Sequence, residues 1–279
     1  MTGPTDDRQY TDVLYEVEDP VATITLNRPE KLNSFTAATL AELRDAVGRA
    51  AADPAVVGIV ITGVGRGFSA GLDSAQLSAT AQQGSAARGE PSDEVPGLFT
   101  WLLSVDKPVI AAVNGVAAGG GFVLSVLCDV RFASTDAWFT TVFSKRGLIA
   151  EHGTTWIVPR LLGHGRALDL LWSSRRVDAE EALRIGLVEF VVPPDELLAA
   201  ARQYVVDLAQ QVSPASLADT KRLVYRHLGV GYEDAMREAE GVLWEAMDRP
   251  DATEGVQSLL ERRPPEFPRL GSTPQEGTS

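Results

Sequence analysis

Two apolar runs, each followed closely by glycines, constrain this chain more than any other feature of its sequence. Val109–Val113 leads into Asn114–Gly121, a stretch that ends in three consecutive glycines. Val56–Ile61 is followed in the same way by Gly63 and then by Phe68–Asp73. Short, uninterrupted apolar runs of this kind are typical of strands buried on both faces of a parallel sheet. Glycines after such strands let the backbone approach another group closely and leave N–H groups free to point at it.

The glycine-rich turns have two interpretations, and the residues alone leave both open. They serve as turns only, or one N–H group from each turn binds the oxygen of a carbonyl that becomes negative during a reaction. A helix over Phe122–Leu127 begins directly after the glycines, so its positive end would add to those donors. The spacing of Gly115 and Gly119–Gly121 matches neither a dinucleotide-binding fingerprint nor a phosphate-binding loop.

The rest of the chain alternates between predicted strands and helices. Val13–Val17 and Val21–Leu26 are β-rich runs that predict a hairpin. Thr36 predicts the start of a helix, because its hydroxyl suits an N-cap and an apolar stripe follows. Further short strands are expected around Val130–Ala133 and Leu187–Val192. Strands alternating with helices, followed by a helical end, indicate an α/β fold.

The same pattern suggests how the chain is divided. We expect a core over residues 11–193, a helical module over 194–263, and polar tails at residues 1–10 and 264–279. The stretch Ser74–Gly97 is rich in Ala, Gln, Ser and Gly and is expected to be a loop with at most one weak helix.

Charge and composition exclude several classes of protein. The chain carries 25 Lys+Arg against 38 Asp+Glu, a net charge of −13, which argues against a nucleic-acid-binding protein. No apolar run reaches the length of about 18 residues that a membrane span needs, and the first residues lack the order of a signal peptide. The lone Cys128 cannot form an internal disulfide, and three scattered histidines make a metal site improbable. We therefore expect a cytoplasmic protein.

Three acidic residues need a separate explanation. Glu151 interrupts the apolar run Gly147–Gly153, where partial desolvation would raise its pKa and suit it to proton transfer; a cap or a solvated side chain is the alternative. Asp73 is expected to brace the turn at Ala70. Asp129 is expected to begin a strand rather than to do chemistry.

Several motifs in this sequence resemble those of one known family. FSAGLD at 68–73 together with KPVIAAVNGVAAGGG at 107–121 resembles the crotonase (enoyl-CoA hydratase/isomerase) superfamily, and TLNRPEKLNSF at 25–35, CDVRFAS at 128–134 and GLVEFVVPPDEL at 186–197 fit as well. The resemblance covers roughly residues 11–263. It implies a crotonase-like spiral of ββα repeats with a C-terminal helical trimerisation module, assembled as a homotrimer or a dimer of trimers.

The resemblance also implies a substrate and a site. The substrate is an acyl-CoA thioester, with coenzyme A as part of the substrate and no separate cofactor or metal. Its carbonyl would lie in an oxyanion hole made by the backbone N–H groups of Leu72 and Gly120. The residues implied to line the substrate and CoA site are Arg28, Lys31, Leu32, Ser69, Ala70, Asp73, Gly119, Val123 and Phe143.

Two positions depart from the family pattern. Hydratases of the family use two glutamates, and at the corresponding positions this chain has Val123 and Phe143. Neither side chain can accept or donate a proton, whereas adding water to a 2-enoyl thioester needs both a base and a proton source. The chain is instead similar to single-glutamate Δ3,Δ2-enoyl-CoA isomerases, with Glu151 on the base. His152, which follows it, is a second candidate catalytic residue that could orient Glu151, donate a proton or merely pack.

Three functions remain as hypotheses. The first is isomerisation of a 3-enoyl-CoA by the single base Glu151. The second is hydration, or another lyase or hydrolase reaction of the superfamily, with Glu151 and His152 recruited in place of the missing glutamates. The third is binding of acyl-CoA without catalysis. In each case the apolar acyl wall would come from aromatic residues that equally suit core packing: Trp101, Trp138, Phe139 and Phe143.

Overall fold

The predicted hairpin and buried strands form one mixed six-stranded sheet in the computed structural model, which describes residues 10–83 and 95–271. Its strands are β1 (Val13–Glu18), β2 (Val21–Leu26), β3 (Gly58–Gly63), β5 (Val109–Val113), β7 (Val130–Ser134) and β10 (Phe190–Val192). β1 and β2 pair antiparallel, the remaining neighbours pair parallel, and the order is β1-β2-β3-β5-β7-β10. The sheet is therefore the scaffold from which the glycine-rich turns leave.

A second, smaller sheet brings the two glycine-rich turns together. Its strands are β4 (Gly67–Ser69), β6 (Val116–Ala118), β8 (Trp138–Thr140) and β9 (Val177–Asp178), in that order across the sheet. β4 and β6 pair parallel, with Ser69 opposite Ala117. Because the first turn follows β4 and the triple glycine follows β6, both turns leave the small sheet side by side at the same edge.

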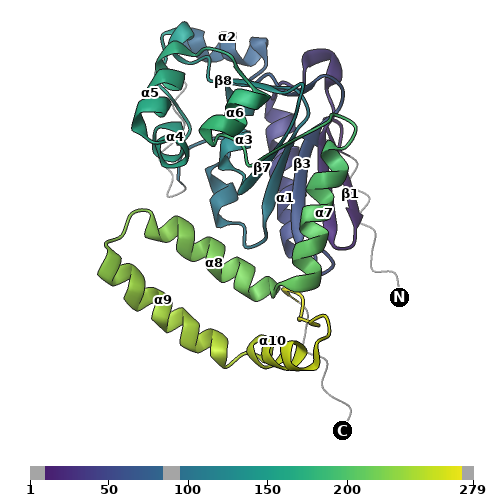
Figure 1. Ribbon diagram of the computed structural model, residues 1–279. Coiled ribbons are helices and arrows are strands. Elements are labelled where there is room, and N and C mark those ends of the chain that lie inside the picture. The colour runs from purple at the N-terminus through teal and green to yellow at the C-terminus, as the bar shows by residue number, and fades with distance from the viewer. Residues whose placement is uncertain (1–9, 84–94, 272–279) are drawn as a thin grey trace.

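Alternating side chains of the large sheet bury two separate apolar faces. Ile59 and Ile61 point into the main core with α1 (Ala37–Ala52), whereas Val60 lies between them in sequence and packs with α7 (Leu197–Gln211) on the other face. This follows from the period of two along a strand. Figure 1 shows α7 across one face of the sheet and α1 behind it. The core is thus layered helix–sheet–helix.

The helix that follows the triple glycine is central to the core. α3 (Gly120–Leu127) is buried along its whole length, as its apolar composition predicts. Around it lie α4 (Thr154–Leu162), α5 (His164–Ser173) and α6 (Ala179–Ile185), and α2 (Ser74–Gln83) lies beyond the first turn. Short 3-10 turns complete the core: η1 (Pro29–Lys31), η3 (Thr100–Ser104) and η4 (Ser144–Arg146).

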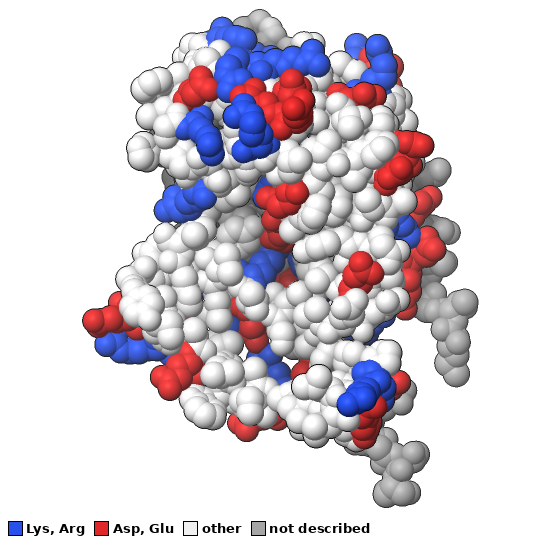
Figure 2. All heavy atoms as spheres, in the orientation of Figure 1, with Lys and Arg blue, Asp and Glu red and all other residues white. Residues whose placement is uncertain are grey.

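The last three helices form an arm that extends from the core. They are α8 (Pro214–His227), α9 (Tyr232–Met247) and α10 (Pro250–Glu261), and they lie below the core in Figure 1. Large apolar side chains remain exposed on all three, among them Val224, Trp244 and Leu259. Most of the arm is white in the view of Figure 2, with charged side chains in small groups. We call α8–α10 the helical arm below.

The structure confirms several local expectations and corrects others. The β1–β2 hairpin is present, and the Thr36 hydroxyl caps α1 by accepting from the N–H of Thr39 at 3.1 Å. The strand expected at Val56–Ile61 begins two residues later, and the strand expected at Leu187–Val192 covers only Phe190–Val192. Leu187 is instead buried just after α6, where Gly186 ends that helix in the left-handed region.

Two longer stretches bear on the predicted division of the chain. The stretch expected to be a loop begins with the ten-residue helix α2, and residues 84–94 of it lie outside the described residues. α7 belongs to the span predicted as the C-terminal module, yet its buried residues Leu197, Ala201 and Val205 pack on the large sheet. The division at residue 193 stays a prediction; in the structure, the part that extends from the core begins at α8.

Candidate active site

The two glycine-rich turns touch through their backbones. A Cβ atom on Gly71 would lie 2.7 Å from the carbonyl oxygen of Ala118 and 2.9 Å from the nitrogen of Gly120. A Cβ on Gly121 would lie only 2.1 Å from the carbonyl oxygen of Ser69. Gly71 also has a φ of +92°, which other residues rarely adopt. These glycines are required for close approach, so the interpretation of the turns as turns only is incomplete.

An isolated bridge between Phe35 and Leu72 uses the N–H and carbonyl groups on either side of Leu72, but not the N–H of Leu72 itself. Phe35 forms a parallel bridge with Leu72: its N–H donates to the Gly71 carbonyl at 2.7 Å, and its carbonyl accepts from the N–H of Asp73 at 2.9 Å. In a parallel pair the intervening N–H points the other way. Within the described part of the chain, the N–H of Leu72 donates to no backbone carbonyl.

The second turn offers a matching donor. Gly120 is the first residue of α3, where backbone N–H groups have no partner inside the helix and carry the positive end of its dipole. Its N–H also donates to no backbone carbonyl among residues 10–83 and 95–271. Leu72 and Gly120 thus present two unused donors on adjacent turns, which is the arrangement that stabilises a developing oxyanion.

Hydrogen bonds join the segment around η1 to the first glycine-rich turn. Leu32 has a φ of +49°, and its carbonyl accepts from the N–H of Ala70 at 2.9 Å. The buried Ser69 hydroxyl donates to the Asn33 carbonyl at 2.8 Å and accepts from the N–H of Gly71 at 3.1 Å. The sequence-predicted residues Leu32, Ser69 and Ala70 therefore meet, and their polar groups support the turn.

Charged residues of the same region form a small cluster. The Arg28 guanidinium donates to the Ser34 carbonyl at 2.6 Å and lies 3.5 Å from the carboxylate of Asp73. Asp73 caps α2 by accepting from the N–H of Ala75, and that hydrogen bond lowers the pKa of the carboxyl, with Arg28 adding to it. Lys31 is exposed at the end of η1, so its ammonium is available to an anion.

Asn33 is a site-supporting residue that the sequence reasoning missed. Its buried side-chain amide donates to the carbonyls of Val64 at 3.0 Å and Gly67 at 2.7 Å, and its oxygen accepts from the N–H of Arg28 at 2.8 Å. It therefore ties η1 to the β3–β4 connection. The available signal was the residue type, because Asn tolerates the left-handed region better than most residues and here has a φ of +54°.

Val123 and Phe143, which the family resemblance places at the glutamate positions of hydratases, are buried. Val123 lies in α3 with no exposed surface, and Phe143 is 6 % exposed at the start of η4. Both belong to the main core cluster. No water-activating group exists at either position.

Glu151 and His152 lie together in a turn before α4. The Nε2 atom of His152 is 3.5 Å from Oε2 of Glu151, and the two side chains are 22 % and 35 % exposed respectively. His152 has a φ of +55°, and Thr154 donates through its N–H and hydroxyl to the Glu151 carbonyl at 3.0 Å and 2.7 Å. Burial lowers the pKa of His152, and the nearby Glu151 charge opposes that shift only in part. The imidazole is therefore neutral at neutral pH.

A series of packing contacts leads from Gly120 towards this turn. The ring of Phe35 lies against Gly120, and its centroid is 5.2 Å from that of Phe99. Next to Phe99, a Cβ on Gly97 would lie 3.6 Å from Cα of His152. A cavity of about 650 Å³ opens along this segment, with Trp101, Trp156, Leu103, Leu127, Gly153 and Arg44 among its lining residues.

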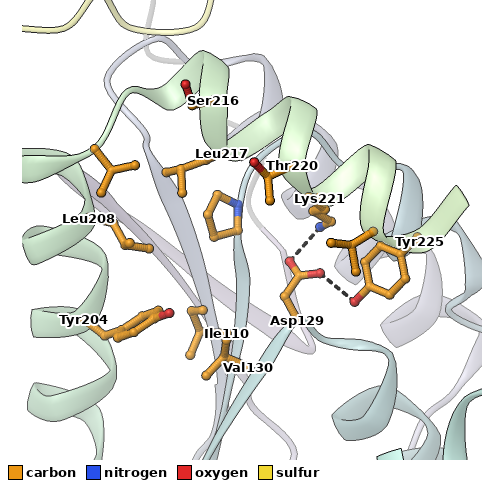
Figure 3. Close-up of a pocket in the computed structure, with 13 residues that line it drawn as sticks. Ile110, Asp129, Val130, Tyr204, Leu208, Ser216, Leu217, Thr220, Lys221 and Tyr225 are labelled. Atoms are coloured by element: carbon orange, nitrogen blue, oxygen red, sulfur yellow. Dashed lines mark hydrogen bonds and ion pairs between the residues drawn. The ribbon is translucent and has the colours of Figure 1, made fainter. Parts of the chain in front are cut away.

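A second cavity, of about 320 Å³, lies between α7 and α8 (Figure 3). Its lining includes Pro108 and Asp129, which directly precede β5 and β7, and no residue of either glycine-rich turn. Asp129 accepts from Lys221 Nζ at 2.7 Å and from the Tyr225 hydroxyl at 2.9 Å, and both partners come from α8. The cluster fastens the helical arm to the core. Asp129 itself lies just before β7, which begins at Val130.

Neither a metal centre nor a membrane span is found in the described part of the chain. No group of three or more His, Cys, Asp or Glu side chains there is placed to hold a metal ion. No helix there is both long and apolar enough to cross a bilayer.

With this geometry in place, relatedness to known proteins decides the family. Residues 16–269 match the family model described as Enoyl-CoA hydratase/isomerase. The chain belongs to the enoyl-CoA hydratase/isomerase family. A probable enoyl-CoA hydratase from Mycobacterium tuberculosis is 35% identical over 263 residues, covering 91% of this chain and 92% of the relative. The chain is therefore an enzyme of this family, and the family's names include more than one reaction.

Solved structures of the family confirm the crotonase-like α/β fold. A putative enoyl-CoA hydratase from Streptomyces coelicolor superimposes with a TM-score of 0.85 at 30% identity, covering 98% of each chain. A monofunctional enoyl-CoA isomerase from M. smegmatis superimposes with a TM-score of 0.67 at 34% identity, covering 81% of this chain and 98% of the other. The family contains both hydratases and isomerases, so the reaction has to be argued from the residues of this site.

Proposed function

We propose that this enzyme converts 3-enoyl-CoA thioesters into conjugated 2-enoyl-CoA thioesters, with Glu151 as the single base. The observation that carries the proposal is the contrast between three positions. Val123 and Phe143 are buried and apolar, whereas Glu151 keeps a partly exposed carboxylate in the turn reached from Gly120 through Phe35 and Phe99. Moving a double bond needs one group that shuttles one proton, and one carboxylate suffices.

The proposed mechanism follows from the two donors and the base. The thioester oxygen accepts hydrogen bonds from the N–H groups of Leu72 and Gly120, which makes the C2 protons more acidic. The Glu151 carboxylate removes a proton from C2, and the electron pair delocalises onto the oxygen as a dienolate. The protonated Glu151 then returns the proton to C4. The negative charge is largest in the dienolate, so the two donors stabilise it more than they stabilise the substrate.

His152 is proposed to position the base. Its imidazole lies 3.5 Å from the Glu151 carboxylate and is neutral at neutral pH, because burial lowers its pKa. A neutral imidazole can donate one hydrogen bond to the Glu151 carboxylate without the strong pairing of an imidazolium.

The CoA moiety is proposed to bind beside the first turn. Lys31 presents an exposed ammonium there, and Arg28 lies behind it with its charge shared with Asp73. The frame of this site is supplied by hydrogen bonds that hold the backbone of the two turns, made by Leu32, Ser69, Ala70 and Gly119. The acyl tail is proposed to enter the cavity of about 650 Å³, whose walls include Trp101 and Trp156.

Assembly as a homotrimer, or a dimer of trimers, is proposed to cover the helical arm. Leu259 and Leu260 are 76% and 77% exposed, and Trp244 of α9 is 62% exposed. Apolar surfaces of this kind are typical of contacts between subunits.

Hydration is the second candidate, favoured by the names of the relatives. A crotonyl-CoA hydratase from Syntrophomonas wolfei is 34% identical over 264 residues and covers 92% of this chain. In that case Glu151 and His152 together would activate water and supply the proton. A protein that only binds acyl-CoA remains the third outcome of the test below.

The ultraviolet absorbance of the conjugated thioester distinguishes these functions. With a 3-enoyl-CoA the proposal expects rising absorbance, and with a 2-enoyl-CoA hydration would give falling absorbance. Glu151→Gln is expected to lower the isomerisation kcat by about 10²–10⁴-fold and to leave CoA binding intact. Glu196→Gln is the matched control, because Glu196 is exposed at the start of α7 without a side-chain capping bond.

Each alternative has its own outcome. If Glu151→Gln keeps at least about a tenth of the activity, the single-base mechanism is wrong. Detectable binding of 3-enoyl-CoA with no absorbance change for either substrate would favour a binding protein.

A further inference from the structure

A buried cluster of hydroxyl groups lies directly behind the second glycine-rich turn. Thr141 Oγ1 lies 2.9 Å from Ser174 Oγ and donates to the Leu170 carbonyl at 3.1 Å. Thr140 Oγ1 donates to the carbonyl of Ser174 at 2.9 Å. All three hydroxyl-bearing residues are buried. The cluster therefore joins the end of β8 to the C-terminal end of α5.

The cluster is connected to the turn by the backbone. The N–H of Gly119 donates to the Thr140 carbonyl at 3.1 Å. Val142 approaches the same glycine, because its Cγ2 would lie 3.1 Å from a Cβ placed there. At the far end of the segment, the Ser144 hydroxyl donates to the Leu171 carbonyl. Residues 140–144 are thus fastened to the end of α5 on both sides of the contact with Gly119.

Backbone strain indicates that this fastening is needed. Val142 has a φ of +55° and Ser174 a φ of +45°, and a β-branched residue such as Val rarely occupies the left-handed region. A residue remains in such a conformation only when its surroundings hold it there. The hydrogen bonds of Thr141 and Ser174 are the surroundings that hold both strained positions.

We propose that Thr141 and Ser174 are positioning residues for the oxyanion hole. The chain of contacts runs from α5 through the two hydroxyl groups to the Thr140 carbonyl, then to Gly119, and sets the direction in which the Gly120 N–H points. This inference rests on the proposed role of Gly120 as an oxyanion donor. Donors of this kind act mainly on the charge that develops during the reaction, so their misplacement lowers kcat more than it changes KM.

The first test removes one hydroxyl without changing the side-chain shape. Thr141→Val is expected to lower kcat by about tenfold or more while KM stays within about twofold, since losing a whole donor costs about 10²–10³. Thr141→Ser keeps the hydroxyl and should restore kcat to near the wild-type value. Thr62→Val is the control, because the buried Thr62 hydroxyl makes an equivalent 2.8 Å bond to the Ala112 carbonyl within the large sheet.

A second variant guards against loss of folding. Ser174→Gly removes the other hydroxyl at a position whose φ of +45° glycine adopts readily. It is expected to lower kcat in the same way as Thr141→Val.

A spectroscopic readout reports the hole directly. A conjugated aryl-enoyl-CoA that binds without turnover absorbs at longer wavelength when its carbonyl is polarised. The wild type and Thr62→Val should show the full red shift, and Thr141→Val a smaller one at saturating ligand. If Thr141→Val behaves like Thr62→Val in both kcat and red shift, the positioning role is wrong while the proposed function stands. If the wild type shows neither turnover nor a red shift, the oxyanion hole itself is wrong, and the inference is overturned with it.

Discussion

The glycine-rich turns and the helical arm are built in opposite ways. At the turns, backbone touches backbone so closely that a Cβ on Gly121 would overlap the Ser69 carbonyl. On the arm, Gly241 of α9 has nothing within 4 Å of where its Cβ would be, and Leu259 is exposed. The backbone atoms of the turns contact each other within the chain, whereas large apolar side chains of the arm such as Trp244 and Leu259 remain exposed. This difference is what the proposed site within one chain and the proposed contact of the arm with another subunit both rest on.

One polar cluster joins the helical arm to the large sheet of the core. The Asp129 carboxylate accepts from the Val109 N–H at 2.7 Å on the core side and from Lys221 and Tyr225 on the arm side. Lys221 Nζ also donates to the Lys107 carbonyl at 3.1 Å. Burial, together with the Asp129 charge, raises the pKa of Tyr225, so its hydroxyl stays protonated as a donor. Three changes test the contrast, from the largest expected effect on stability to the smallest.

Adding one methyl group to the turns should have the largest effect. Gly121→Ala places a Cβ 2.1 Å from the Ser69 carbonyl, so the two turns must separate. We expect a loss of about 3 kcal/mol or more in unfolding free energy and loss of turnover, measured by urea denaturation and the absorbance assay. Gly241→Ala makes the same change in open space on α9 and should stabilise by about 0.5–1 kcal/mol. Equal effects of the two substitutions would contradict the contrast.

Removing the charge of Asp129 should loosen the arm and spare the core. Asp129→Asn leaves the partly buried Lys221 ammonium without its anion, and we expect a loss of about 2–3 kcal/mol in unfolding free energy. Hydrogen exchange should accelerate in α8 and not in α7. Tyr225→Phe removes only one hydrogen bond and should cost about 1 kcal/mol. Unchanged protection of α8 in Asp129→Asn would show that the cluster does not fasten the arm.

Charging the exposed face of the arm should change assembly rather than folding. Leu259→Glu with Leu260→Glu replaces side chains that are about three-quarters exposed, so the folding of a single chain should change by less than about 0.5 kcal/mol. The mass measured by light scattering is expected to fall from an oligomer to a monomer. Thr253→Glu adds charge at another exposed position of α10 and should keep the wild-type mass. A monomeric wild-type protein would remove the basis of the proposed assembly.

Local sequence signals predicted the parts of the fold that local physics controls. The β1–β2 hairpin, the Thr36 cap and the strand Val109–Val113 follow from residue type and periodicity within a few neighbours. The three-residue strands β4, β6 and β8 were missed, because so short a run has no measurable period. They form only because each pairs with a neighbour that is distant in the sequence.

For the site, residue types alone located the two glycine-rich turns. They also identified Val123 and Phe143 as apolar residues at positions where the resemblance implies glutamates. Glycine is the only residue without a Cβ, so a strand that ends in several glycines already indicates where backbone meets backbone. Long-range contacts determine which N–H groups stay unpaired. The bridge between Phe35 and Leu72 uses the Gly71 carbonyl and the Asp73 N–H, and it leaves the Leu72 N–H without a backbone acceptor in the described residues. The Thr141–Ser174 contact arises in the same way. Hydrogen-bond partners far apart in the chain meet only when the sheets and helices have packed, because their meeting has no local cause.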